Sequence, residues 1–179
     1  MITETQLPSL NALDYLPYLD ENGVITEDLQ KKIGVYAIFN ENKKLKFIGY
    51  SRDIYASLKQ HLVRQTQQCH WLKVEIITRP SRTILEEIKT NWTEENGDLS
   101  IDNQENQNLW TQAIDAKVCM TEEDKETYKN SDELGKIKLL KTVSRRVQAD
   151  IEETLKQRGN KMKVRFNPKL KEQGLLDLK

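Results

Sequence analysis

The sequence predicts an α+β fold: a small three-stranded antiparallel sheet flanked by helices, followed by a mainly helical C-terminal extension. Two strand-like apolar runs are separated by a polar turn, and a stretch with helical apolar spacing follows them. A third strand-like run then precedes a helix with clear start and stop signals. The chain is therefore expected to divide into a leader over 1–32, a sheet domain over 33–97 and an extension over 98–179.

The leader is expected to pack on the sheet domain without forming a long helix. Leucines recur every three residues in it, but Pro8 and Pro17 interrupt any helix. The Asn22-Gly23 pair indicates a turn, and residues 25–32 are typical of a short helix.

The elements of the sheet domain are predicted from apolar periodicity and from capping residues. The runs GVYAIF and LKFIGYS form a hairpin, and Asp53 caps the helix that follows. The run WLKVEIIT predicts the third strand. Ser81 is a good N-cap for the next helix, and Gly97 ends it.

The extension is predicted to be polar at first and helical later. Residues 98–107 are typical of a loop, and residues 113–120 are expected to be extended. Thr121 and Asp124 have the spacing of a capping box at the start of a short helix. A long helix is expected to begin at Ser131 and to end near residue 157.

Composition and cysteine usage limit the class of protein. Hydrophobic residues make up 37% of the 179 residues and charged residues 31%. No run approaches the roughly 18–20 apolar residues that a membrane span needs, and the first ten residues lack the basic and apolar regions of a signal peptide. We expect a cytoplasmic or organelle-stromal protein with no membrane partner, in which Cys69 and Cys119 are reduced.

Charge is unevenly distributed along the chain, although the net charge is zero. Residues 86–133 contain 14 acidic and four basic residues, whereas residues 136–171 contain 12 basic and three acidic ones. Two interpretations stay open: the segments neutralise each other within one fold, or the basic segment meets a polyanion.

The hairpin and the helix after it also carry a family motif. Gly34-Val35-Tyr36 lies on the first strand, Phe47-Ile48-Gly49 on the second, and the string FIGYSRDIYASLKQHL continues into the helix. On these residues the chain resembles the GIY-YIG nuclease family, over the 65 residues from 33 to 97. The string SLKQHLVR, the segment around Trp92 and the ending NPKLKEQGLLDLK further resemble members from cyanobacteria and chloroplasts.

The resemblance implies a site for cleaving phosphodiester bonds. It implies catalytic roles for Tyr36 and His61, and Mg²⁺ or Mn²⁺ held by Glu86 or Glu87 if the protein is active. The alternatives are a buried hydrogen-bonded His61 and a solvated helix face at the two glutamates. Phe47 and Ser57 stand where the family has a second tyrosine and an arginine, so the resemblance implies a degenerate active site.

A set of basic residues in the extension suggests contact with nucleic acid. An apolar stripe and a basic stripe share the long predicted helix, and basic residues alternate with apolar ones just after it. Such stripes suit a phosphate backbone, and the alternative is a solvated face. The candidate DNA or RNA contacts are Lys138, Lys141, Arg145, Lys156, Lys161, Lys163 and Arg165.

Three functional hypotheses follow from the sequence. The first is a nuclease-like protein that binds nucleic acid with weak or lost cleavage. The second is an active metal-dependent endonuclease. The third is a protein-interaction or assembly factor that uses the fold as scaffold, with the acidic segment and the GLLDLK tail as partner surfaces.

Overall fold

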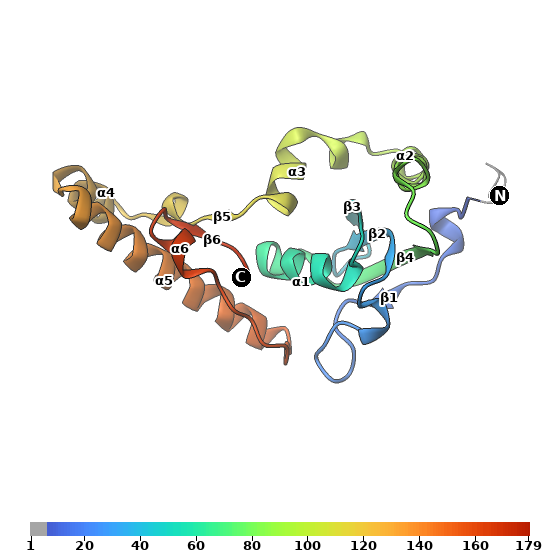
Figure 1. Cartoon of the computed structure of the whole chain (residues 1–179), viewed down its shortest axis with the longest axis horizontal. Helices are drawn as coiled ribbons and strands as arrows, with labels where there is room; N and C mark the ends of the chain where they lie inside the picture. Colours follow the sequence, from blue (N-terminus) through green and yellow to red (C-terminus); the bar gives the residue numbers. More distant parts are fainter. Residues whose placement is uncertain (1–6) are drawn as a thin grey trace. The chain divides into compact units, whose positions relative to one another are not determined.

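A computed structural model describes residues 7–179, and it confirms an α+β fold with a small antiparallel sheet and several helices (Figure 1). The chain forms two compact units, Met1–Thr111 (unit 1) and Gln112–Lys179 (unit 2). The predicted three-part division of the chain stays a prediction. Within residues 7–179, no helix combines the length and the apolar character that a membrane crossing requires.

Unit 1 is built on one antiparallel sheet. Its strands are β1 (Leu16–Pro17), β2 (Ile33–Phe39), β3 (Leu45–Ser51) and β4 (Trp71–Ile77), in the spatial order β1-β4-β2-β3. The three predicted strands are confirmed. The short strand β1 comes from the leader, and it pairs with the first two residues of β4.

Two capped helices accompany this sheet. Helix α1 (Ile54–Arg64) begins after Asp53, whose carboxylate accepts a backbone N–H from the first turn. Helix α2 (Arg82–Asn96) begins after Ser81, whose hydroxyl does the same, and ends at Gly97 with φ +80°. The capping residues thus act where the sequence places them.

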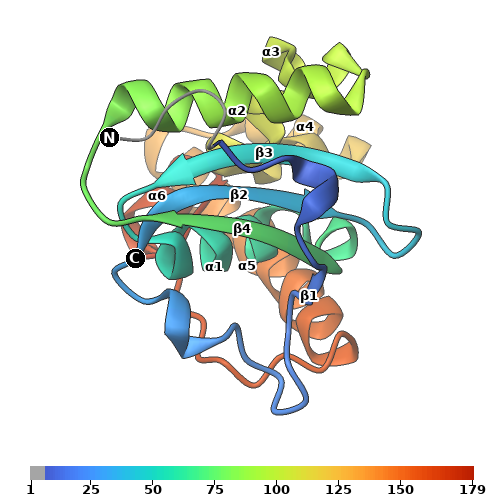
Figure 2. The ribbon, with the colours of Figure 1, turned by 90° about the vertical axis from the view of Figure 1, so that its right-hand side faces the viewer.

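The two helices cover opposite faces of the sheet (Figure 2). Alternate strand side chains point to opposite faces, so each face has its own core. Tyr36 and Phe47 face α1, and their rings contact His61 there. The other face packs on α2, and its buried cluster includes Val35, Ala37, Phe39, Ile48, Leu85, Ile88 and Trp92.

The leader is fixed to the end of α2. The Glu95 carboxylate accepts hydrogen bonds from the Ser9 hydroxyl and from the backbone N–H groups of Leu10 and Asn11. The indole of Trp92 donates to the Pro8 carbonyl at 2.9 Å. Residues 8–11 therefore contact the C-terminal half of α2.

The prediction of a loop over residues 98–107 is wrong. The chain there forms a 3-10 helix (Leu99–Asp102) and helix α3 (Gln104–Thr111). The Asn103 side chain accepts the backbone N–H of Asn106, as an N-cap does. Burial of Trp110 adds a tertiary contact that local polarity does not reveal.

Unit 2 is mainly helical. Its elements are β5 (Ile114–Asp115), α4 (Glu122–Asn130), α5 (Glu133–Gln157), α6 (Pro168–Lys171) and β6 (Leu175–Leu176). Strands β5 and β6 pair antiparallel, and the capping box predicted for α4 is present. The remaining short 3-10 helices of the described chain are Leu10–Ala12, Glu27–Leu29, Thr66–Gln68 and Ala116–Cys119.

Helix α5 has the predicted apolar stripe, and its N-cap is Asp132. The buried side chains Leu140, Val143 and Val147 carry the stripe. Beyond α5, residues 161–165 keep the predicted alternation of exposed basic and half-buried side chains. They form no strand, and a single bridge joins Phe166 to Leu178.

We predict that Gly34→Ala strongly destabilises unit 1. A Cβ at position 34 would overlap the Glu75 carbonyl group, so β2 and β4 would have to separate. The expected loss is about 2 kcal/mol or more, measured by urea unfolding. Gly97→Asn is the control, because asparagine tolerates positive φ at a helix end and open space surrounds Gly97. Equal stability of Gly34→Ala and the parent protein would contradict this interpretation of the sheet.

Candidate functional site

The structure brings Tyr36 and His61 together between the sheet and α1. Tyr36 is on β2 and His61 on α1, and the phenolic oxygen lies 2.8 Å from His61 Nε2. Both side chains are buried, with exposed fractions of 3% and 4%. The two residues that the motif singles out are therefore neighbours, and their catalytic role stays a prediction.

Hydrogen bonding determines the tautomer of His61. Its Nδ1 atom lies 2.8 Å from the carbonyl oxygen of Trp110. A carbonyl oxygen only accepts, so Nδ1 carries the hydrogen and donates it. In the neutral ring, Nε2 is then the acceptor for the Tyr36 hydroxyl.

Aromatic rings close the site from the side of α3. Trp110 stacks on Phe47 with 5.3 Å between ring centroids and 12° between planes. The centroid of Phe47 lies 5.0 Å from that of His61, and Trp110 is only 2% exposed. The Tyr36–His61 pair is thus surrounded by apolar surface.

Burial keeps both members of the pair neutral. It lowers the pKa of His61 to about 3, and the nearby Arg64 guanidinium lowers it further. Burial also raises the pKa of Tyr36 well above its usual value of 10. At neutral pH the site therefore holds a phenol and a neutral imidazole whose acceptor nitrogen is already in use.

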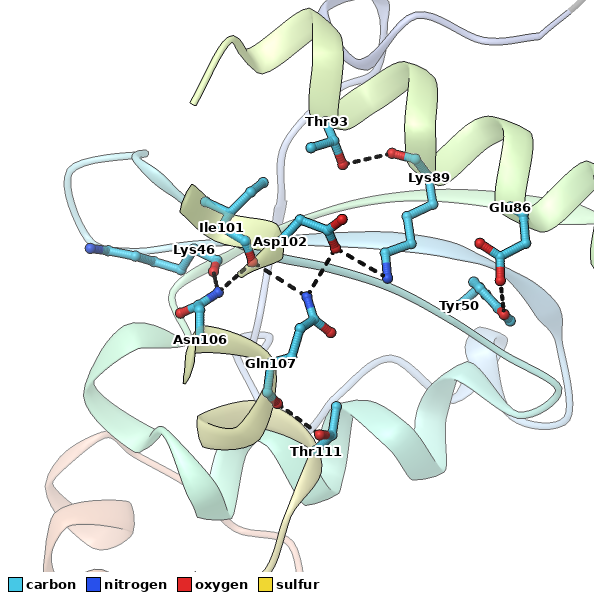
Figure 3. Close-up of polar contacts among 10 residues, drawn as sticks. All are labelled: Lys46, Tyr50, Glu86, Lys89, Thr93, Ile101, Asp102, Asn106, Gln107 and Thr111. Atoms are coloured by element: carbon cyan, nitrogen blue, oxygen red, sulfur yellow. Dashed lines mark hydrogen bonds and ion pairs between the residues drawn. The ribbon is translucent and has the colours of Figure 1, made fainter. Parts of the chain in front are cut away.

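A polar network holds α3, and with it Trp110, against the rest of unit 1 (Figure 3). Lys89 of α2 forms an ion pair with Asp102 at 3.6 Å, and the Gln107 amide donates to the same carboxylate. The Asn106 amide donates to the Lys46 carbonyl of β3 at 3.0 Å. These contacts connect α3 to both α2 and β3.

The two substituted motif positions carry no charge. Phe47 offers only its ring face, which Trp110 covers. Ser57 donates its hydroxyl to Ser51 Oγ at 2.7 Å, and so completes a local turn network. Neither side chain can form the charged, bidentate hydrogen bonds to phosphate that a guanidinium forms.

The two predicted metal ligands, Glu86 and Glu87, lie next to each other on α2. Glu86 accepts a hydrogen bond from the Tyr50 hydroxyl at 2.5 Å (Figure 3), and Arg82 lies 3.9 Å from it. The hydrogen bond to Glu86 is the main cause of the raised pKa of Tyr50. Glu87 is exposed, and residues 7–179 contain no group of three or more His, Cys, Asp or Glu side chains suited to a metal ion. Binding of Mg²⁺ or Mn²⁺ by these residues stays a prediction.

The predicted basic residues of unit 2 are available to a partner with one exception. Lys141 forms an ion pair with Glu172 at 3.3 Å. The other six are exposed, and in the described chain none of their side chains has an ion pair or hydrogen bond. These six, which we call the basic set, are Lys138, Arg145, Lys156, Lys161, Lys163 and Arg165.

Sequence reasoning missed Trp110, the residue that seals the site. A lone tryptophan at the end of a polar run, three residues after Gln107, was the available signal. A large apolar residue in such a run indicates a buried anchor.

Comparison with known proteins finds a relative of a different kind. No family model matches the chain. Over 94 residues, 52% of the chain, it is 31% identical to a bifunctional monothiol glutaredoxin-S16 of Arabidopsis thaliana, described as chloroplastic. The chain covers 28% of the length of that protein.

This similarity corrects the family and function expected from the motif. The relative is named as a glutaredoxin, so the predicted membership of the GIY-YIG family and the predicted nuclease-like function are wrong. The closed geometry agrees with this correction, because Tyr36 and His61 are sealed and positions 47 and 57 lack the required groups.

We predict that His61 makes stability depend on pH. The folded state binds a proton on His61 only near pH 3, whereas the unfolded chain binds it near pH 6.5. Stability should therefore fall as the pH is lowered through this window, by up to about 1.4 kcal/mol per pH unit. His61→Gln, which does not titrate, should remove that part of the slope in urea unfolding, and His70→Gln should not. Identical slopes for His61→Gln and the parent protein would contradict the assignment.

We predict that Trp110→Ala opens the site. The loss of the buried indole should cost about 3 kcal/mol or more. Water then reaches His61, so its pKa should rise toward 6.5, as measured by NMR titration of the ring protons. Leu109→Ala is the matched control, since Leu109 is 53% exposed on the same helix. A His61 pKa that remains near 3 in Trp110→Ala would show that another group provides the seal.

Proposed function

We propose that this chain is a thiol-independent binding module that works beside monothiol-glutaredoxin chemistry. The thiol step itself is carried by a separate domain or protein. The relative supports an association with a monothiol glutaredoxin, because its name describes a bifunctional protein that contains one. The observation that carries the proposal is the inert cysteine of unit 1.

Cys69 cannot act as an exchanging thiol in the folded state. It is 0% exposed, and its Sγ lies 3.6 Å from the His61 carbonyl oxygen. Thiol–disulfide exchange needs an accessible thiolate, which a buried thiol does not provide. The matched segment is longer than unit 2, so it includes part of unit 1.

The second cysteine, Cys119, is exposed at the end of a 3-10 helix in unit 2. It gives the proposal a direct test, because it is the accessible thiol of the described chain. A compartment that keeps both thiols reduced suits the protein, either the cytoplasm or a chloroplast stroma like that named for the relative.

The partner surface that we propose is the basic set of unit 2. Its six cations have no acidic partner within residues 7–179, so binding a polyanion costs no internal ion pair. DNA or RNA stays the predicted partner class for this surface, whose cations would meet the phosphate backbone.

The first test measures thiol catalysis and partner binding together. We expect no glutathione-dependent reduction of a glutathionylated peptide above background, with identical traces for Cys119→Ser. A purified monothiol glutaredoxin is the positive control, and its binding to this chain is measured by calorimetry. Turnover that disappears in Cys119→Ser would overturn the proposal, since the chain would then be a thiol catalyst itself. Absence of binding to the glutaredoxin would also count against it.

The second test measures the salt dependence of polyanion binding. Affinity for a labelled duplex or single strand should fall steeply as salt rises, with a slope close to the number of phosphates neutralised. Lys161→Gln with Lys163→Gln should lower that slope by roughly 2. The control Lys141→Gln should change it less, because Lys141 is already paired. A slope that the double variant leaves unchanged would remove this surface from the proposal.

A further inference from the structure

The leader, the β2–β3 turn and the start of β4 meet at one end of the sheet (Figure 2). A second group of aromatic rings there holds an ammonium. The rings of Tyr15 and Trp71 are 6.3 Å apart and inclined at 71°, so they form a corner. The Nζ atom of Lys43 lies 4.9 Å from the centroid of each ring. Both distances are within the range of cation–π attraction.

We propose that this corner is a binding site for a quaternary ammonium group, and that Lys43 is its internal occupant. The proposal does not depend on the proposed function. The structure itself demonstrates that a cation is accommodated between the two rings.

The Lys43 side chain is free to leave the corner. It is exposed, and within residues 7–179 the two rings are the only interaction partners of its ammonium. The turn that carries it is held by other groups. The Asn40 side chain accepts the backbone N–H groups of Asn42 and Lys44 at 3.0 and 2.9 Å. Displacement of the lysine side chain therefore leaves the turn intact.

The two rings are preorganised for a ligand. Tyr15 packs edge-on against Phe39 with 5.0 Å between centroids. The buried Lys73 ammonium lies 4.3 Å from the centroid of Tyr15 and donates to the Leu10 carbonyl. The positive charge of Lys73 is present while the Lys43 ammonium lies over the rings. An external cation in place of Lys43 would therefore experience the same electrostatic repulsion from Lys73.

The chemistry of the corner favours a cation without N–H donors. A primary ammonium has three donors, and Lys43 finds no hydrogen-bond acceptor in the corner among the described residues. A trimethylammonium group has no donor to satisfy, and it can contact two ring faces at once. Such a group occurs in trimethylated lysine and in choline headgroups, which share the same recognition chemistry.

The probe for the test is tetramethylammonium chloride, titrated at constant ionic strength. Trp71 is the reporter, because it is half-buried whereas Trp92 and Trp110 are 0% and 2% exposed. We expect saturable change in tryptophan emission, with about tenfold tighter binding to Lys43→Ala than to the parent protein. Lys44→Ala is the matched control and should bind like the parent protein, because the cation–π contacts of the two rings come from Lys43 and Lys73.

Two further measurements make the proposal falsifiable. The variant Tyr15→Leu, checked for folding by circular dichroism, should lose most of its affinity for tetramethylammonium. The uncharged analogue 3,3-dimethyl-1-butanol should not bind, since attraction to the ring faces needs the charge. Equal binding of the uncharged analogue, or no saturable binding of tetramethylammonium to Lys43→Ala, would overturn the proposal.

The same titration distinguishes the two sources of the ligand. A peptide with trimethylated lysine and free phosphocholine are compared on the full chain and on Lys43→Ala. Tighter binding of the peptide assigns the site to modified protein, and tighter binding of phosphocholine assigns it to a headgroup. Failure of both to bind would overturn the proposal even if tetramethylammonium binds.

Discussion

The interior of unit 1 depends on Trp110, which supplies both an indole that covers the site and a backbone carbonyl. The carbonyl accepts hydrogen bonds from His61 Nδ1 and from the Arg64 guanidinium, each at 2.8 Å. A histidine and a tyrosine can be buried only if each polar atom finds a partner. The carbonyl satisfies one side of the His61 ring, the Tyr36 hydroxyl satisfies the other, and the indole of Trp110 excludes water from both.

As a result of this closure, the buried titratable side chains of unit 1 contribute to its core and are not accessible to solvent. Its buried histidine is neutral, its buried tyrosine keeps its proton, and its cysteine is out of reach of a disulfide. The groups that could react are thus used to complete the core. The two surfaces that we propose for binding are the basic set of unit 2 and the Tyr15–Trp71 corner of unit 1, where the Lys43 ammonium lies over both rings.

The sequence predicts local structure well where a helix-capping residue or a periodic apolar pattern marks the element. Asp53 and Ser81 begin their helices and the three strands occupy the expected runs, because these signals act between near neighbours. The site was harder to predict, since its closing residue comes from α3, a helix made stable by burial of Trp110 and by the contact of Lys89 with Asp102. Such distant contacts leave no periodic pattern in the sequence.

The motif that suggested a nuclease has a local structural cause. Gly34 is needed because any Cβ would meet the backbone of β4 at Glu75, and Gly49 because a Cβ would lie 2.8 Å from the hydroxyl oxygen of Tyr36. Tyr36 in turn needs its position opposite Gly49, where its ring passes over the neighbouring strand to reach His61. The order and spacing of these residues therefore follow from packing one tyrosine across a hairpin onto a helix. Packing accounts for these residues, so the motif indicates the sheet, and function has to be argued from the groups of the site.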